Sequence, residues 1–169
     1  GSGMGANMTL LSLKGNDSNG MFAEKLLKEA GVNAHLISDE NQSTTLKQRF
    51  RSKGKSLLRV NHLRKSALNK SQQLEILEKL KTIIEDLDLL VFSDFNYGCL
   101  PQPLVDQMVK KSKNAKKLIV ADSQSSSQVG DISRFQGMDV VFATEREARI
   151  CLQNSEDGLV VLAEKLRIK

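Results

Sequence analysis

The stretch Asp88–Pro101, DLLVFSDFNYGCLP, decides the fold that the sequence predicts. It opens with the continuous apolar run Leu89–Phe92, which is typical of a strand covered on both faces in a parallel α/β sheet. The run then breaks into small, polar and aromatic residues, and a helix is expected after Pro101 and Pro103. Because open α/β sheets bind ligands where their strands end, Asp94 lies where a site is expected. The alternative is that Asp94 only caps the loop.

Length and composition indicate one ordinary globular domain. The chain has 169 residues, of which 40% are hydrophobic and 27% charged, enough for a core. A net charge of +5, without a basic stripe interleaved with aromatics, argues against a nucleic-acid partner. Cys99 and Cys151 lack metal-ligand spacing and indicate free thiols in a reducing compartment. No apolar run approaches membrane-spanning length and no signal peptide is evident, so we expect a cytoplasmic protein without a membrane partner.

The first third of the chain predicts a strand–helix–strand unit. Strands are expected over Met8–Leu13 and Asn33–Ser38, and a helix over Asn19–Ala30. Asp17 or Ser18 is suited to begin that helix by accepting a backbone N–H bond.

A β-hairpin is expected next. Thr44–Ser52 and Ser56–Asn61 alternate charged and uncharged residues around the turn Lys53-Gly54-Lys55. The charges predict one wet face. The pattern does not choose between a flap over a site and an edge extension of the sheet.

The remainder predicts alternating helices and strands. The expected helices are Gln72–Asp86, a helix after Pro103, Thr144–Leu152 and Glu156–Arg167. The expected strands are Asp88–Ser93, Lys117–Ala121 and Asp139–Phe142, with a polar loop over Ser123–Asp131.

Three of these strands are followed by polar groups: Asp94, Asp122, and Thr144 with Glu147. In a parallel sheet the three would lie along one edge, where carboxylates hold Mg²⁺ and backbone N–H groups receive phosphate. The alternative for Glu147 is a first-turn acid that complements the helix dipole.

Short motifs follow one another along nearly the whole chain. Gly5–Leu11 is similar to G-A-x-V-x-L, and Gly15–Gly20 to G-D-D-x-x-G. Thr44–Arg49 resembles T-x-K-x-R, and Leu57–Val60 resembles the start of L-L-R-V-D. Ser93–Leu100 resembles S-D-Y-G-K-G-x-L.

Two further motifs complete the set. Asp122 falls where D-P-K is found, and Thr144–Glu147 falls on N-x-x-E. In this order and spacing, the motifs resemble the PfkB (ribokinase-like) carbohydrate kinases, closest to their heptose-phosphate kinase branch.

The resemblance implies a three-layer α/β/α Rossmann-like core with a mostly parallel sheet, in which the hairpin 44–61 forms part of a lid. It also implies phosphoryl transfer from ATP to a hydroxyl of a sugar or sugar phosphate, assisted by Mg²⁺. The residues that it assigns to the nucleotide are Asp122, Thr144 and Glu147, with Glu147 orienting the metal. Those that it assigns to the substrate are Lys47, Arg59 and Asp94.

This sequence departs from the family pattern at several positions. Thr144 replaces Asn, Tyr97 stands in place of Lys, Ser123-Gln124 replaces Pro-Lys, and Asn61 replaces Asp. Two of these changes remove cations that would face phosphate. They motivate a second hypothesis, a non-catalytic sugar- or nucleotide-binding domain derived from a kinase.

The resemblance also predicts that the chain is one partial domain, 1–169. The family's G-A-G-D motif, with its anion hole and catalytic Asp, would lie beyond Lys169, and its opening glycine-rich segment before Gly1. We therefore expect no catalytic base in these residues and no phosphotransferase activity from them alone. A third hypothesis is an interaction module, because unpaired hairpin edges favour a homodimer.

Overall fold

The computed structural model describes residues 1–63, 66–124 and 131–169. They form two compact units, Gly1–Ala67 and Leu68–Lys169. Part of the expected polar loop Ser123–Asp131 falls at 125–130, outside the described residues.

The first unit contains the expected strand–helix–strand arrangement. After a short 3-10 turn, η1 (Ser2–Met4), the elements are β1 (Thr9–Gly15), α1 (Ser18–Glu29) and β2 (Asn33–Asp39). β1 and β2 are parallel and in register from Thr9 opposite Asn33 to Gly15 opposite Asp39. The Asp17 side chain begins α1 by accepting a bond from the Gly20 N–H, which confirms one of the two expected caps.

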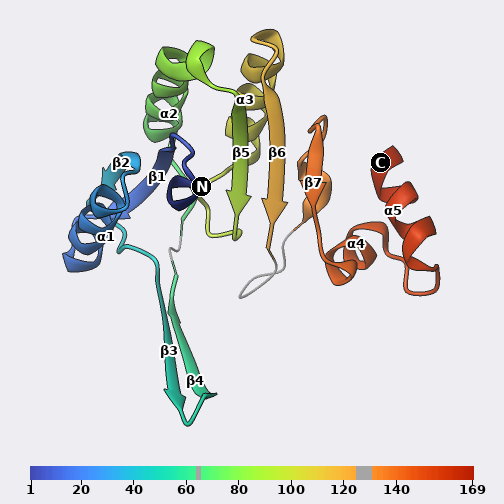
Figure 1. The fold of residues 1–169 in the computed structure, drawn as a ribbon, viewed down its shortest axis with the longest axis horizontal. Helices are drawn as coiled ribbons and strands as arrows, with labels where there is room; N and C mark the ends of the chain where they lie inside the picture. The colour runs from blue at the N-terminus through green and yellow to red at the C-terminus, as the bar shows by residue number, and fades with distance from the viewer. Residues whose placement is uncertain (64–65, 125–130) are drawn as a thin grey trace. The chain divides into compact units, whose positions relative to one another are not determined.

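The predicted hairpin is confirmed as β3 (Leu46–Ser52) and β4 (Lys55–His62), which pair antiparallel. Lys53 and Gly54 at its turn have φ angles of 46° and 78°, a left-handed pair that matches the twist of two-residue hairpins. In the described part of the chain these strands pair only with each other, so the hairpin projects as a two-stranded ribbon (Figure 1).

The second unit is built around a three-stranded parallel sheet in the order β5-β6-β7. The strands are β5 (Leu89–Asp94), β6 (Leu118–Ser123) and β7 (Val140–Phe142). The helices are α2 (Lys70–Ile83), η2 (Ile84–Asp86), α3 (Gln102–Asn114), η3 (Ile132–Arg134), α4 (Glu145–Leu152) and α5 (Leu159–Ile168). Across the described ranges, no helix has both the length and the apolar character needed to span a bilayer.

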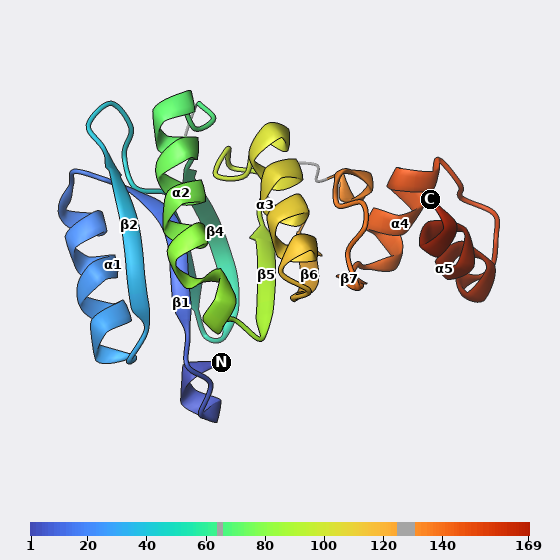
Figure 2. The ribbon, with the colours of Figure 1, turned by 90° about the horizontal axis from the view of Figure 1, so that it is seen from above.

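α2 and α3 lie on the same face of this sheet (Figures 1 and 2). α3 packs on β6, and α2 packs on α3. The apolar residues at helical spacing on these helices and alternate residues of β5 and β6 are buried and form the core. Its most buried members are Leu80, Phe92, Leu104, Val105, Ile119 and Ala121. The Asn69 side chain begins α2 with a capping box to Gln72.

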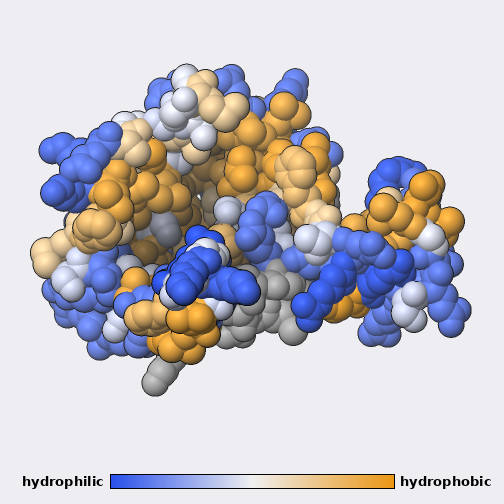
Figure 3. Space-filling model, turned by 60° about the horizontal axis from the view of Figure 1, so that its bottom comes forward, coloured by the Kyte–Doolittle hydropathy of each residue, from blue (hydrophilic) through white to orange (hydrophobic). Residues whose placement is uncertain are grey.

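The opposite face of the sheet is exposed at β5, whereas the sequence predicted a strand covered on both faces. Leu89 and Val91 remain 44% and 52% exposed, and Phe142 on β7 is 59% exposed. Figure 3 shows hydrophobic surface gathered over these strands. The expectation of cover on both faces is therefore wrong for the described residues, because both long helices of this unit pack on one side. The unbroken apolar run of β5 is nevertheless typical of a strand that is buried on both faces of a sheet.

Candidate functional site

The carboxyl ends of β5, β6 and β7 lie along one edge of the sheet, as predicted. The strands are parallel, and Ser93 pairs with Asp122, which pairs in turn with Phe142. Neighbouring residues of a strand point to opposite faces. Because Asp94 pairs with Ser123, its side chain belongs to the helix-covered face, and that of Asp122 belongs to the other. The two carboxylates therefore share an edge but not a face.

Asp94 is engaged within the protein. Its side chain is 4% exposed, and Oδ1 accepts the backbone N–H of Asn96 at 2.8 Å. Asn96 has a φ of 58°, a left-handed conformation that such a side-chain bond supports. The loop-capping role that the sequence left open for Asp94 is therefore present. Its role toward a substrate stays a prediction.

Arg134, at the end of η3, is the partner of Asp94 that sequence reasoning missed. Its Nη1 donates to Asp94 Oδ2 at 3.0 Å, its Nη2 to the Leu100 carbonyl, and its Nε to Gln102 Oε1 at 3.3 Å. The guanidinium also stacks 5.2 Å from the centre of the Phe135 ring. One side chain therefore ties together the end of β5, the following loop and the start of α3.

Asp122 is half-buried on the uncovered face of β6. Its Oδ2 accepts the side-chain amide of Gln124 at 2.8 Å, and that contact is exposed. Gln124 stands where the family motif has Lys, so an amide occupies the position of a cation. The position remains accessible for a polar ligand.

Thr144 and Glu147 form a reciprocal capping box at the start of α4. Glu147 Oε2 accepts the Thr144 N–H at 2.8 Å and the Thr144 hydroxyl at 2.7 Å, and Thr144 Oγ1 accepts the Glu147 N–H at 3.3 Å. Glu147 is 5% exposed. Glu147 is thus a first-turn acid of α4, which is the alternative that the sequence left open. A role of Glu147 in holding a metal stays a prediction.

The oxygen donors at this edge suit one way of holding Mg²⁺. Outside residues 64–65 and 125–130, no group of three or more His, Cys, Asp or Glu side chains is placed to hold a metal. Mg²⁺ in phosphoryl-transfer sites is commonly held by one or two carboxylates together with phosphates and water. A single oxygen donor such as Glu147 fits that mode.

An open cleft of about 650 Å³ lies beside α4, and Thr144 lines it. Arg146, Arg149 and Asn154 are among its other walls. Arg149 is held by Glu145 at 2.7 Å and also donates to the Asp157 carbonyl at 3.1 Å. Glu145 also lines the cleft and pairs with Arg149, so Arg146 is the lining cation that is not engaged in that ion pair.

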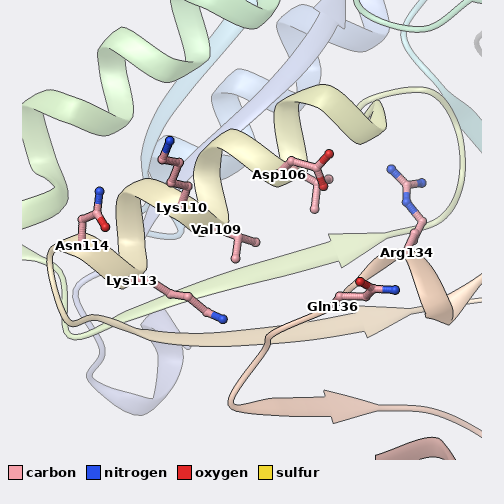
Figure 4. A pocket seen from close by; sticks show the side chains of 8 residues that line it. Asp106, Val109, Lys110, Lys113, Asn114, Arg134 and Gln136 are labelled. Atoms are coloured by element: carbon pink, nitrogen blue, oxygen red, sulfur yellow. The ribbon is translucent and has the colours of Figure 1, made fainter. Parts of the chain in front are cut away.

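A second groove, of about 350 Å³, lies between α3 and the segment around η3 (Figure 4). Lys113, Val109 and Gln136 line it, with the Arg134 side chain at one end. Since all three donor nitrogens of Arg134 are already bonded, the cations left for a ligand are exposed lysines of α3. We assign no site here.

The hairpin has one basic face and one apolar face. Lys47 lies opposite Asn61, and Arg49 lies opposite Arg59, so the three cations share a face. The other face carries Phe50 opposite Leu58, both exposed. The segment 46–62 contains six Lys and Arg residues and no acidic residue. Sequence reasoning chose Lys47 and Arg59 but missed Arg49, which alternation and register would have found.

Comparison with known proteins identifies the family. Residues 2–168 match the description "pfkB family carbohydrate kinase". The chain belongs to the pfkB family of carbohydrate kinases. The resemblance drawn from the motifs is thereby confirmed, and the α/β fold with parallel sheets and an antiparallel hairpin is that of pfkB kinases.

Curated relatives of this pfkB chain include bifunctional HldE proteins. That of a Nitratiruptor species is 26% identical over 157 residues, which are 90% of this chain and 32% of the relative. That of Sulfurimonas denitrificans is 31% identical over 147 residues, which are 86% of this chain and 30% of the relative. The chain therefore spans about a third of the length of these relatives.

Solved structures with the same fold include other kinases. A mutant of phosphofructokinase-2 from Escherichia coli superimposes with a TM-score of 0.72 at 15% identity, covering 96% of this chain and 52% of that one. Ribokinase from Giardia lamblia superimposes with a TM-score of 0.67 at 15% identity, covering 94% of this chain and 48% of the ribokinase chain. These likenesses concern the fold.

Proposed function

We propose that this chain is the central part of an ATP-dependent kinase whose acceptor is a phosphorylated sugar, a heptose phosphate in the first instance. The observation that carries the proposal is the basic face of the hairpin, with Lys47, Arg49 and Arg59 and no acidic residue between 46 and 62. A neutral sugar would not need three cations, whereas a phosphate dianion binds well to guanidinium groups.

In the proposed reaction, a sugar hydroxyl oxygen forms a bond to the γ-phosphorus of ATP, the bond from that phosphorus to the bridging oxygen breaks, and ADP leaves. The hydroxyl proton passes to a base, which we assign to no residue of this chain. Lys47, Arg49 and Arg59 hold the sugar phosphate. Asp122 and the start of α4 contact the nucleotide. Glu147 would hold Mg²⁺, which when bound neutralises charge on the phosphates.

The test measures the melting temperature of the 169-residue chain with a heptose phosphate, a hexose phosphate, the two unphosphorylated sugars and Mg·ATP. A ligand that binds only the folded chain raises it. We expect a rise with at least one sugar phosphate and none with its neutral sugar. Lys47→Gln and Arg59→Gln should abolish the rise, whereas Lys25→Gln, which removes an exposed cation of α1, should keep it. A rise that is equal for neutral and phosphorylated sugars would contradict the proposal.

A second candidate function is self-association through the hairpin. Its apolar face exposes Phe50 and Leu58, and its edges have no other strand to pair with in the described residues. A homodimer is therefore proposed. Light scattering should show a dimer that Phe50→Ser converts to a monomer; a monomer at every concentration would remove this candidate.

A further inference from the structure

The base of the hairpin is joined to the loop after β1 by a compact network of hydrogen bonds. The Thr44 N–H donates to Asp17 Oδ2 at 2.8 Å, and the Thr44 hydroxyl donates to Asp17 Oδ1 at 2.7 Å. That hydroxyl also accepts the Gly15 N–H at 2.8 Å, and Asp17 Oδ1 accepts the Gly20 N–H at 2.8 Å. The network therefore joins the end of β1, the start of α1 and the residue that lies two before β3.

The two glycines of this network leave no room for a side chain. A Cβ at Gly15 would lie 2.5 Å from the Gln42 carbonyl oxygen and 2.6 Å from the Thr44 nitrogen. A Cβ at Gly20 would lie 2.5 Å from the Gly15 carbonyl oxygen and 3.0 Å from Thr44 Oγ1. Both glycines are buried. The two glycines of Gly15-x-Asp17-x-x-Gly20 thus allow the segment 42–44 to lie directly against the loop.

The network matters because strand pairing does not connect the hairpin to the other strands described in its unit. Within the described residues, β3 and β4 pair only with each other. Thr44 lies just before the ribbon, at its β3 end, so contacts made by Thr44 bear on the direction in which the ribbon projects (Figure 1). A rotation at this point would displace Lys47 and would displace Arg59 further, since Arg59 lies farther from Thr44 along the ribbon.

We propose that Asp17 and Thr44 are positioning residues that fix the direction of the hairpin and so place its basic face for the anionic substrate. The substrate half of this statement rests on the proposed function; the anchoring half does not. Neither residue is assigned contact with a ligand. The hydrogen bonds from Thr44 and Gly20 also hold the pKa of the Asp17 carboxyl below its usual value, so the acceptor is ionised at neutral pH.

The variants separate anchoring from helix capping. Asp17→Asn keeps a side chain that caps helix N-termini as well as Asp does. It replaces one carboxylate oxygen, an acceptor, with an amide donor that faces the Thr44 N–H. Thr44→Val keeps the shape of the side chain and removes the hydroxyl, whereas Thr44→Ser restores it. Thr45→Val is the matched control, because the neighbouring residue has no part in the network described above.

The experiment measures the distance between spin labels at Lys25→Cys on α1 and Lys55→Cys on the hairpin, with Cys99→Ser and Cys151→Ser removing the native thiols. We expect one narrow distance distribution for the parent, Thr44→Ser and Thr45→Val. Asp17→Asn and Thr44→Val should give a distribution at least twice as wide while the far-ultraviolet circular dichroism stays unchanged. An unchanged width in both variants would overturn the proposal.

A ligand arm separates this proposal from the proposed function. If anchoring serves substrate binding, Thr44→Val should weaken binding of the heptose phosphate at least fivefold and Thr44→Ser should restore it. Broadened distances with unchanged affinity would overturn the substrate half alone. If the parent binds no sugar phosphate, the proposed function fails, and the distance measurement still decides whether Asp17 and Thr44 anchor the hairpin.

Discussion

Replacing Arg134 with Gln should destabilise the second unit markedly. The substitution leaves Asp94, whose side chain is 4% exposed, without its cation, and removes the bonds to the Leu100 carbonyl and Gln102. Removing one partner of a buried ion pair costs about 3–5 kcal/mol. Because 17% of the Arg134 side chain is exposed, we expect the lower end, about 3 kcal/mol.

Urea unfolding followed by circular dichroism measures this loss. With a slope of about 2 kcal/mol per molar urea, the midpoint should fall by about 1.5 M. Arg134→Lys keeps the positive charge but loses the forked geometry of the guanidinium group. Its urea midpoint should therefore lie between those of the parent and Arg134→Gln. It provides a measurement if the Gln variant does not fold.

The matched control is Arg167→Gln on α5. Arg167 also makes two bonds to a carboxylate, Glu164, but both side chains are largely exposed, so its midpoint should not move measurably. The double variant of Arg134→Gln with Asp94→Asn should lose less than the two single losses added, since no unpaired charge remains buried. Equal midpoints for Arg134→Gln and Arg167→Gln would refute the reasoning.

Three further predictions follow from the same geometry. Thr144→Ala should lower the unfolding free energy by about 1 kcal/mol through loss of the α4 cap, and Thr144→Ser should restore most of it; equal stabilities of the parent and the Ala variant in urea would contradict this. Because hydrogen bonds in the folded chain, first from Thr44, depress the pKa of Asp17, its stabilising contribution is full above the usual value of 3.8 and is lost as the pH falls through the lower folded pKa. Unfolding free energies measured from pH 5 downward should therefore fall less steeply in Asp17→Asn, and identical slopes would show that Asp17 is not responsible. The exposed sheet face should bind a hydrophobic dye, and Val91→Thr with Phe142→Thr should reduce its fluorescence while the circular dichroism is retained; unchanged fluorescence would place the dye elsewhere.

Most of the fold followed from local patterns in the sequence. Apolar runs and helical spacing placed every β-strand and α-helix described in the second unit to within a few residues, but not the short helix η3, and alternation around Gly54 gave the hairpin. The uncovered face of β5 was not predicted, because an apolar run reports which faces a strand can bury and not what covers them.

The candidate site was predicted in part. The order of strands and their parallel direction follow from alternating helices and strands, so the shared edge of Asp94 and Asp122 was foreseen. Arg134 was not, because it is 40 residues from Asp94 and no local periodicity marks it. The link from Asp17 to Thr44 spans 27 residues and was missed for the same reason.

The central claim is that this chain belongs to a kinase acting on a phosphorylated sugar. The most direct test is to express the whole uninterrupted reading frame that contains these 169 codons and to measure transfer of labelled γ-phosphate from ATP to a panel of heptoses, hexoses and their phosphates. We predict transfer to at least one sugar phosphate, lost in Lys47→Gln and Arg59→Gln and retained in Lys25→Gln. Absence of transfer to every sugar phosphate by the folded protein, or transfer to neutral sugars alone, would contradict the claim.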